Sequence, residues 1–281
     1  MSALPTTQKQ ILLCRRPHGV PVAEDFALGE GPVPESAGPG QVLVRQIYLS
    51  LDPAIRGWMS ESKSYLPPIA IGAPVRSGTL VQVVESGVPE WQPGDLCQAL
   101  TAWEEYSLVP AAQLMGKITP VPGIPLSSML NVLGGNGLTA YFGLYDVGQP
   151  RPGETVLVSA AAGGVGSIVG QLAKIRGCRV VGLTGASDKC EWLTGELGFD
   201  AAINYKAPNF LQQLKDVCPK GVDVFFDGVG GELLDLVLPR LAMRGRVVVC
   251  GAISEINRTE PGPGLRNVMQ LMAKRARMEG F

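Results

Sequence analysis

The sequence has very few of the side chains that bind zinc. It holds a single histidine, His18, and its six cysteines are scattered along 281 residues without a Cys-x-x-Cys pair. Zinc sites in proteins use clustered cysteine and histidine ligands. We therefore expect no metal site, a surface position for His18, and cysteines that are reduced and mostly buried.

Charged residues are also scarce, at 17% of the chain, and the two signs nearly cancel to a net charge of −1. A protein that grips a nucleic-acid backbone needs a basic surface, so no nucleic acid is expected as a partner. Hydrophobic residues make up 46% of the chain. Such a composition can bury large cores, which excludes broad disorder.

Long apolar runs are lacking too. No segment is long and uninterrupted enough to span a bilayer, and the first residues have no apolar core of a signal peptide. We expect no membrane partner and a cytoplasmic, reducing location. The length of 281 residues fits two domains better than one.

The first part of the chain has the pattern of short strands. Apolar and β-branched residues alternate with polar ones, and turns rich in glycine and proline separate the runs. The expected strands are 10–17, 41–51, 75–85, 96–100 and 104–109. This pattern predicts a compact, barrel-like β-rich domain over residues 1–125.

The second part, residues 126–281, alternates strands with helices. A strand, a glycine-rich turn, a helix and a second strand over 155–184 form the first half of a dinucleotide-binding unit. Three further helix–strand pairs follow, and the tail predicts a helix over 264–277 and a sixth strand over 278–281. Such alternation predicts an α/β domain with a parallel sheet between two helical layers and ligands at the carboxyl ends of its strands.

The turn at 160–166 carries a near-match to the G-x-G-x-x-G fingerprint. Its three key positions are Ala161, Gly163 and Gly166, so the first glycine is an alanine. Between a strand and a helix, such a turn presents bare N–H groups and the positive end of the helix dipole to a pyrophosphate. The alternative is a glycine turn that serves helix–strand packing alone.

The end of the second strand of this unit indicates which dinucleotide binds. An NAD site places a carboxylate there, about 20 residues beyond the glycines, to bind the ribose 2′-OH. This chain has no acid at 183–186; Lys189 follows closely, and Tyr205 ends the next expected strand. A cation and a hydroxyl can hold a 2′-phosphate, so the expected cofactor is NADP(H). An exposed lysine at a helix start is the alternative for Lys189.

Several segments together resemble one enzyme family. The matching segments are 160–174, 198–200 (GFD), 204–206 (NYK), 250–254 (CGAIS), 49–59 (LSLDPAIRGWM), 64–69 (SYLPPI) and 137–143 (GLTAYFG). The chain resembles the zinc-independent medium-chain dehydrogenase/reductases of the leukotriene B4 dehydrogenase/prostaglandin reductase type, which include alkenal and enone double-bond reductases. This resemblance extends over nearly the whole chain.

The resemblance implies a GroES-like catalytic domain followed by a Rossmann domain that binds NADPH. In such enzymes a hydride passes to the β-carbon of an α,β-unsaturated aldehyde or ketone, and the cofactor supplies the chemistry. The implied cofactor contacts are Gly163, Gly164, Val165 and Gly166 for the pyrophosphate, Lys189 and Tyr205 for the 2′-phosphate, and Thr139, Cys250, Gly251, Ala252, Ile253, Ser254 and Ile256 for the nicotinamide half.

The chain departs from the family's pattern at three positions. Family members often have a tyrosine in place of Ile256 and an asparagine in place of Gly228, and some have a tyrosine in place of Ala54. These departures leave the proton donor unassigned, and Tyr65 is the remaining tyrosine of the expected pocket. An anchor for its own proline-containing loop is the alternative role of Tyr65.

Family members continue beyond the position that corresponds to Phe281, so the resemblance implies a nucleotide-binding domain that is incomplete at its C-terminal end. It also suggests a homodimer, because the nucleotide-binding domains of this family often mediate one. Two alternatives to an enone or enal reductase stay open. One is an NADPH quinone reductase of the related zeta-crystallin type, and the other is an NADPH-binding protein with little catalysis.

Overall fold

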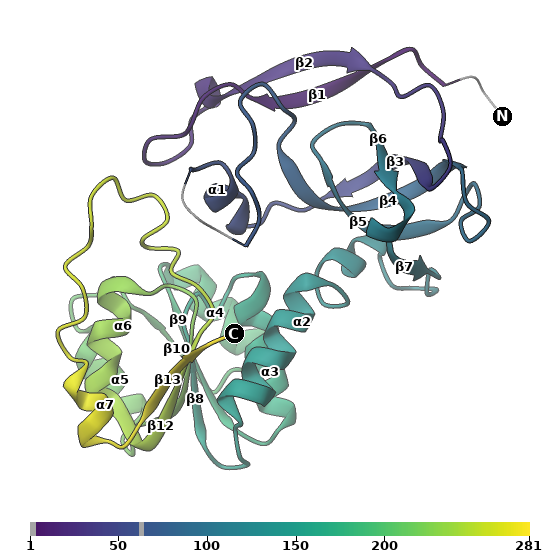
Figure 1. Ribbon diagram of the computed structural model, residues 1–281. Helices are drawn as coiled ribbons and strands as arrows, with labels where there is room; N and C mark the ends of the chain where they lie inside the picture. Colours follow the sequence, from purple (N-terminus) through teal and green to yellow (C-terminus); the bar gives the residue numbers. More distant parts are fainter. Residues whose placement is uncertain (1–3, 62–64) are drawn as a thin grey trace. The chain divides into compact units, whose positions relative to one another are not determined.

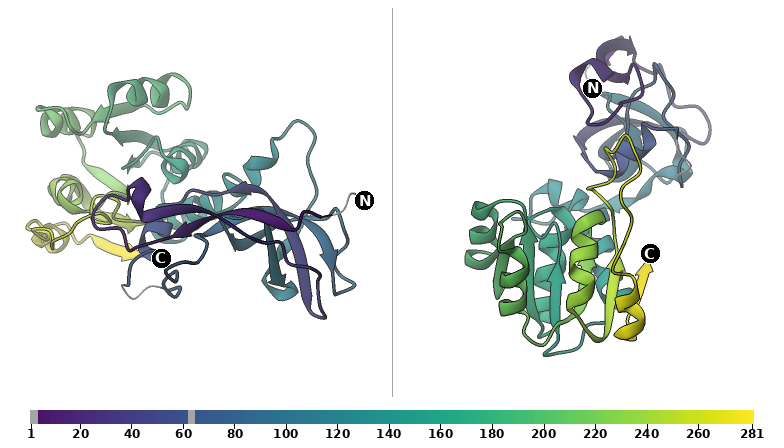
Figure 2. Two further views of the ribbon diagram at one scale, coloured as in Figure 1. Left: turned by 90° about the horizontal axis from the view of Figure 1, so that it is seen from above. Right: turned by 90° about the vertical axis from the view of Figure 1, so that its left-hand side faces the viewer.

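A computed structural model describes residues 4–61 and 65–281, and Figures 1 and 2 show it from three sides. Ser64, which begins one of the segments that resemble the reductase family, lies outside the described residues. The chain divides into two compact units, Met1–Leu130 and Asn131–Phe281. None of the described helices is long and apolar enough to cross a membrane.

The first unit is built from antiparallel strands. A five-stranded sheet has the order β6-β3-β4-β5-β7, and β1 pairs with β2 in a separate ribbon (Figure 1). The strands are β1 Thr7–Leu13, β2 Phe26–Pro32, β3 Gln41–Leu49, β4 Arg76–Ser86, β5 Leu96–Ala102, β6 Tyr106–Pro110 and β7 Met115–Ile118. The helical segments are η1 Ala23–Asp25, α1 Ala54–Trp58, η2 Ala111–Gln113 and η3 Leu126–Leu130.

Strand β2 is not among the strands that the sequence predicts. Its residues, FALGEGP, include two glycines and a proline, which are unfavourable in strands. It forms because it pairs with β1 over its whole length, from Thr7 opposite Pro32 to Leu13 opposite Phe26. The β-rich character expected of this part of the chain is confirmed.

The second unit is a doubly wound α/β domain. Its sheet has the order β10-β9-β8-β11-β12-β13, all parallel, and helices cover both faces (Figure 2). The strands are β8 Thr155–Val158, β9 Arg179–Thr184, β10 Ala201–Asn204, β11 Val222–Asp227, β12 Leu241–Val249 and β13 Arg277–Gly280. The helices are α2 Gly135–Phe142, the π-helical η4 Gly143–Gly148, α3 Gly164–Ile175, α4 Ser187–Gly195, α5 Phe210–Val217, α6 Gly231–Val237, η5 Leu238–Arg240 and α7 Met269–Ala273.

Alternate residues of the central strand β8 face opposite helical layers. Val156 and Val158 belong to a core formed with α2, α3 and α4, whereas Leu157 belongs to a core formed with α5 and α6. A parallel sheet buried in this way has two apolar faces. The predicted parallel sheet between two helical layers is therefore confirmed.

The tail of the chain differs from the prediction. The sequence predicts one helix over 264–277, but the helix that forms there is the short α7. The backbone N–H groups of Arg266 and Asn267 each donate to the buried carboxylate of Asp235 on α6 at 2.7 Å. These contacts hold the residues before α7 in a non-helical path against α6. The expected last strand is present as β13, which pairs with β12.

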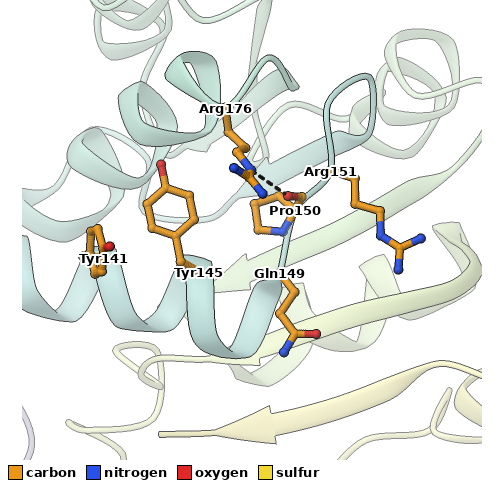
Figure 3. A pocket seen from close by; sticks show the side chains of 6 residues that line it. All are labelled: Tyr141, Tyr145, Gln149, Pro150, Arg151 and Arg176. Atoms are coloured by element: carbon orange, nitrogen blue, oxygen red, sulfur yellow. Dashed lines mark hydrogen bonds between the residues drawn. The ribbon is translucent and has the colours of Figure 1, made fainter.

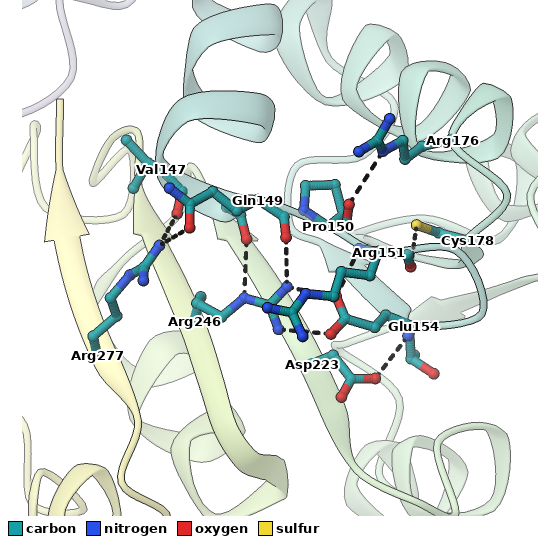
Figure 4. Close-up of polar contacts among 12 residues, drawn as sticks. Val147, Gln149, Pro150, Arg151, Glu154, Arg176, Cys178, Asp223, Arg246 and Arg277 are labelled. Carbon is teal, nitrogen blue, oxygen red and sulfur yellow. Dashed lines mark hydrogen bonds and ion pairs between the residues drawn. The ribbon is translucent and has the colours of Figure 1, made fainter.

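Arginines tie the end of η4 to the sheet (Figure 4). Arg246 of β12 donates to the carbonyl of Gln149 at 2.9 Å and forms an ion pair with Glu154 at 2.5 Å, and Arg277 of β13 donates to the carbonyl of Val147 at 2.6 Å. They satisfy carbonyls that the end of a helix leaves open. Burial opposes ionisation of Glu154, but hydrogen bonds from the Arg246 side chain and the Arg151 N–H, with the charges of both arginines, outweigh it, so the pKa of Glu154 lies below its usual value.

Candidate functional site

The loops at one edge of the parallel sheet carry most of the expected cofactor residues. Strands β10, β9, β8, β11 and β12 are consecutive neighbours, so the loops after them lie next to one another. The glycine turn follows β8, Lys189 lies in the first turn of α4 after β9, Tyr205 follows β10, and 250–256 follows β12. The fold therefore gathers these residues at the carboxyl edge of the sheet.

The turn after β8 exposes backbone donors at the start of α3. This helix begins at Gly164 with Gly163 as its N-cap, and the N–H groups of Gly164, Val165 and Gly166 have no acceptor among the described residues. Free donors at a helix start attract an anion such as a pyrophosphate. A β-carbon on Gly166 would collide with the carbonyl oxygen of Ala160. Packing thus explains why residue 166 is a glycine, while the three free N–H groups fit a bound phosphate.

A buried carboxylate joins this turn to the loop after β11. Asp227 is 0% exposed and accepts hydrogen bonds from the Ser159 hydroxyl at 2.6 Å and the Gly230 N–H at 3.0 Å. The Ser159 oxygen itself accepts from the Gly228 N–H at 2.9 Å. Burial raises the pKa of Asp227, although these hydrogen bonds oppose the shift. We call Ser159 and Asp227 the inter-loop clamp, because they fix the two loops at the carboxyl edge.

The loop after β12 is in turn bonded to the loop after β11. The Ile253 N–H donates to the carbonyl of Gly228 at 3.2 Å, and the N–H and hydroxyl of Ser254 donate to the carbonyl of Val229 at 3.0 and 2.8 Å. Burial raises the pKa of the Cys250 thiol to about 11. The thiol is protonated at neutral pH and is no nucleophile.

The other residues expected near the nicotinamide lie in this loop or on α2. The Gly251 N–H donates to the carbonyl of Asp227 at 3.2 Å, Ala252 is exposed, and Ile256 is half-buried. Half-buried Thr139 is on α2, and the two helices α2 and α3 pack together. Most of the loop residues at this edge are thus among those expected from the sequence, but Ser159 and Asp227 of the inter-loop clamp are not. A signal was present, since Ser159 and Asp227 are polar residues at the ends of apolar strands.

Tyr65 belongs to the first unit. Its side chain is 77% exposed, and its ring lies edge-on to Trp58 with the centroids 6.2 Å apart. The hydroxyl makes no hydrogen bond with the described residues. The ring contact fits the role of a loop anchor, and the role of a proton donor stays a prediction.

A hollow of about 670 Å³ lies elsewhere in the second unit (Figure 3). Its lining residues are Tyr141, Tyr145, Gln149, Pro150, Arg151 and Arg176. Gln149 to Arg151 precede β8 and Arg176 follows α3, so the hollow lies toward the amino ends of the strands. None of the expected cofactor residues lines it. The free donors and the bonded loops, rather than this hollow, identify the candidate site.

Comparisons with known proteins decide the family. One family model, described as the N-terminal domain of oxidoreductase, matches residues 9–116, and another, described as zinc-binding dehydrogenase, matches 164–281. The NADPH-dependent curcumin reductase of Escherichia coli is 46% identical over 96% of this chain and 79% of its own length. The chain belongs to the zinc-independent medium-chain dehydrogenase/reductase family.

Two further similarities support membership of the same family. The 2-alkenal reductase (NADP(+)-dependent) of Nicotiana tabacum is 42% identical over 98% of this chain and 81% of its own. The crystal structure of CurA in complex with NADPH from Vibrio vulnificus has a TM-score of 0.89 and 41% identity, and the match covers 97% of this chain and 81% of that one. The expected family and fold are therefore confirmed.

Zinc, which the second family model's description implies, does not fit the side chains of this medium-chain reductase. Among the described residues, no group of three or more histidine, cysteine, aspartate or glutamate side chains could hold a metal ion. The one histidine, His18, is exposed and lies in the first unit. The donor set thus agrees with membership of the zinc-independent branch.

Proposed function

We propose that this medium-chain reductase uses NADPH to reduce the carbon–carbon double bond of α,β-unsaturated aldehydes and ketones. The observation that carries the proposal is the carboxyl edge of the parallel sheet. It combines three free N–H donors at the start of α3 with a β9 that ends without an acid. The relatives reported above, a curcumin reductase and a 2-alkenal reductase, depend on the same cofactor.

Bound NADPH supplies the hydride for such a reduction, and the chain binds and orients the cofactor. The N–H groups at 164–166 bind the pyrophosphate. Lys189 and Tyr205 bind the 2′-phosphate through charge-assisted hydrogen bonds. The loop at 250–256 and Thr139 border the nicotinamide half. The inter-loop clamp keeps the pyrophosphate turn and the nicotinamide loop in register, since both loops are bonded to the same β11 loop.

Turnover with a substrate panel tests the proposal. The purified protein should consume NADPH with alkenals and enones, and the product should be saturated at the former double bond with its carbonyl intact. Equal efficiency with NADH would contradict the roles of Lys189 and Tyr205. Reduction of quinones in place of enones would instead select the quinone reductase.

Tight NADPH binding without turnover would select a binding protein with little catalysis. In that case the variant Ile256→Tyr supplies the hydroxyl that family members often have at this position. Gain of enone reduction in Ile256→Tyr would assign the loss to this one residue. Light scattering of the purified protein tests the homodimer that the family resemblance suggests. A cytoplasmic location stays a prediction of the sequence.

A further inference from the structure

The ends of β9 and β10 bring a second lysine next to Tyr205. Asn204 pairs with Thr184 at the end of the ladder, and the Tyr205 N–H continues the pairing with the carbonyl of Thr184 at 3.0 Å. The two residues that follow these ends, Gly185 and Lys206, are therefore neighbours across the strands.

Gly185 fixes how close they are. A β-carbon on Gly185 would lie 3.3 Å from the Tyr205 hydroxyl, 3.2 Å from Lys206 Cε and 3.4 Å from Lys206 Nζ. The Tyr205 hydroxyl and the Lys206 ammonium therefore both lie beside the position that a side chain on Gly185 would take. The Lys206 N–H donates to the Asn204 side chain at 3.0 Å, which holds the backbone of this corner in place.

The charges of Lys189 and Lys206 are not paired with a carboxylate of the described residues. Among the described residues, neither Lys189 nor Lys206 lies within ion-pair distance of a carboxylate. The Thr184 hydroxyl donates to the carbonyl of Ala186 at 2.7 Å, so its proton is not free for a ligand. An ammonium and a phenol hydroxyl that both flank the Cβ position of Gly185 are donors suited to a phosphate dianion.

We infer that Lys206, together with Tyr205, holds the 2′-phosphate of NADPH, and that Gly185 is the residue whose missing side chain makes room for this phosphate. The inference rests on the proposed NADPH dependence and adds two residues that set the cofactor preference. Lys206 distinguishes the two dinucleotides, because NADH has no charge at this position. Gly185 directly follows β9, at the strand end where an NAD site has its carboxylate.

Binding measurements test the inference without turnover. Dissociation constants of NADPH, NADH, 2′,5′-ADP and 5′-ADP are measured by calorimetry for the wild type, Lys206→Gln, Lys206→Arg and Gly185→Asp. Loss of a charge-assisted hydrogen bond at an exposed site should weaken NADPH and 2′,5′-ADP about tenfold in Lys206→Gln. Binding of NADH and 5′-ADP should stay unchanged, and Lys206→Arg should keep most of the affinity for NADPH.

Gly185→Asp is an independent variant that keeps both donors. Its carboxylate would attract Lys206 and repel a phosphate, so the preference should shift toward NADH. The matched control is Lys215→Gln, which removes an exposed lysine from the last turn of α5, at the other edge of the sheet. It should bind all four ligands as the wild type does.

Two outcomes would overturn the inference in distinguishable ways. In the first, the wild type prefers NADPH but Lys206→Gln keeps the wild-type ratio of 2′,5′-ADP to 5′-ADP affinity. This result removes the role of Lys206 and leaves the proposed function intact. A wild type that binds NADPH and NADH equally removes both the inference and the proposed cofactor. Near-ultraviolet circular dichroism of each variant verifies that it is folded.

Discussion

The hydroxyl of Tyr65 is one oxygen atom whose role can be separated from that of its ring. Tyr65→Phe keeps the edge-on contact with Trp58 and removes the hydroxyl alone. A positioned general acid contributes about 10²–10⁴-fold to a rate, so kcat for enone reduction should fall about 10²-fold if this group delivers the proton. The control Tyr48→Phe removes another exposed hydroxyl of the first unit. Wild-type kcat in Tyr65→Phe would leave Tyr65 as a loop anchor.

The hydroxyl of Ser159 has a structural role in the inter-loop clamp. Ser159→Ala leaves the buried carboxylate of Asp227 without its 2.6 Å donor and the Gly228 N–H without an acceptor. The free energy of unfolding should fall by about 1–3 kcal/mol, because buried polar groups lose their partners. Urea unfolding measures it. Ser167→Ala on α3 is the control, since this exposed hydroxyl has one long bond of 3.4 Å, and its effect should stay within about 0.5 kcal/mol.

The ion pair of Glu154 with Arg246 predicts a pH dependence of stability. The folded-state pKa of Glu154 lies below its ordinary value of 4.5. Such a group stabilises the fold above the unfolded pKa, and this stability is lost as pH falls through the folded one. Urea midpoints should therefore drop below about pH 4.5. Glu154→Gln should be less stable at pH 7 by about 1–3 kcal/mol and should lose less on acidification. A wild-type acid slope in Glu154→Gln would contradict this account.

At the scale of elements, two helix glycines should respond in opposite directions to alanine. A β-carbon on Gly170 of α3 would overlap the ring of buried Phe199, whereas one on Gly195 of α4 meets nothing within 4 Å. Gly170→Ala should destabilise the unit by about 1–3 kcal/mol through overpacking. Gly195→Ala should stabilise it by about 0.5 kcal/mol, because alanine favours helix. Equal effects of the two substitutions on urea unfolding would show that α3 does not pack this closely.

Elements that follow a local pattern are predictable, and those that depend on a distant partner are not. Strands β9 and β11 are among those that the alternation predicts, since valine, leucine and phenylalanine dominate both segments. Strand β2 is not predicted because its glycines disfavour a strand, and it forms only through its pairing with β1. The predicted tail helix is shortened because Asp235, about 30 residues earlier, binds the N–H groups of Arg266 and Asn267.

At the scale of the whole molecule, the sheet order explains what the sequence reveals of the site. The glycine turn and the absence of an acid after β9 are local signals, and the resemblance supplies the loop after β12. The clamp and the Lys206 corner depend on which strands are neighbours. Ser159 meets Asp227 because β8 lies beside β11, and Lys206 meets Gly185 because β10 lies beside β9. Parallel pairing across the sheet is not readable from a short segment, so these residues emerge from the fold.

Because the expected cofactor contacts lie in Asn131–Phe281, NADPH should stabilise this unit. A ligand at a hundredfold excess over its Kd adds about 2.7 kcal/mol to the free energy of unfolding. Hydrogen exchange locates the effect: amides in 159–166, 184–189 and 250–256 should exchange more slowly with NADPH, most clearly the free N–H groups of Gly164, Val165 and Gly166. At the same concentration NADH should protect the amides of residues 184–189 less, since it has no 2′-phosphate. Protection confined to residues 4–130 would place the cofactor in the wrong unit and remove the basis of the proposed site.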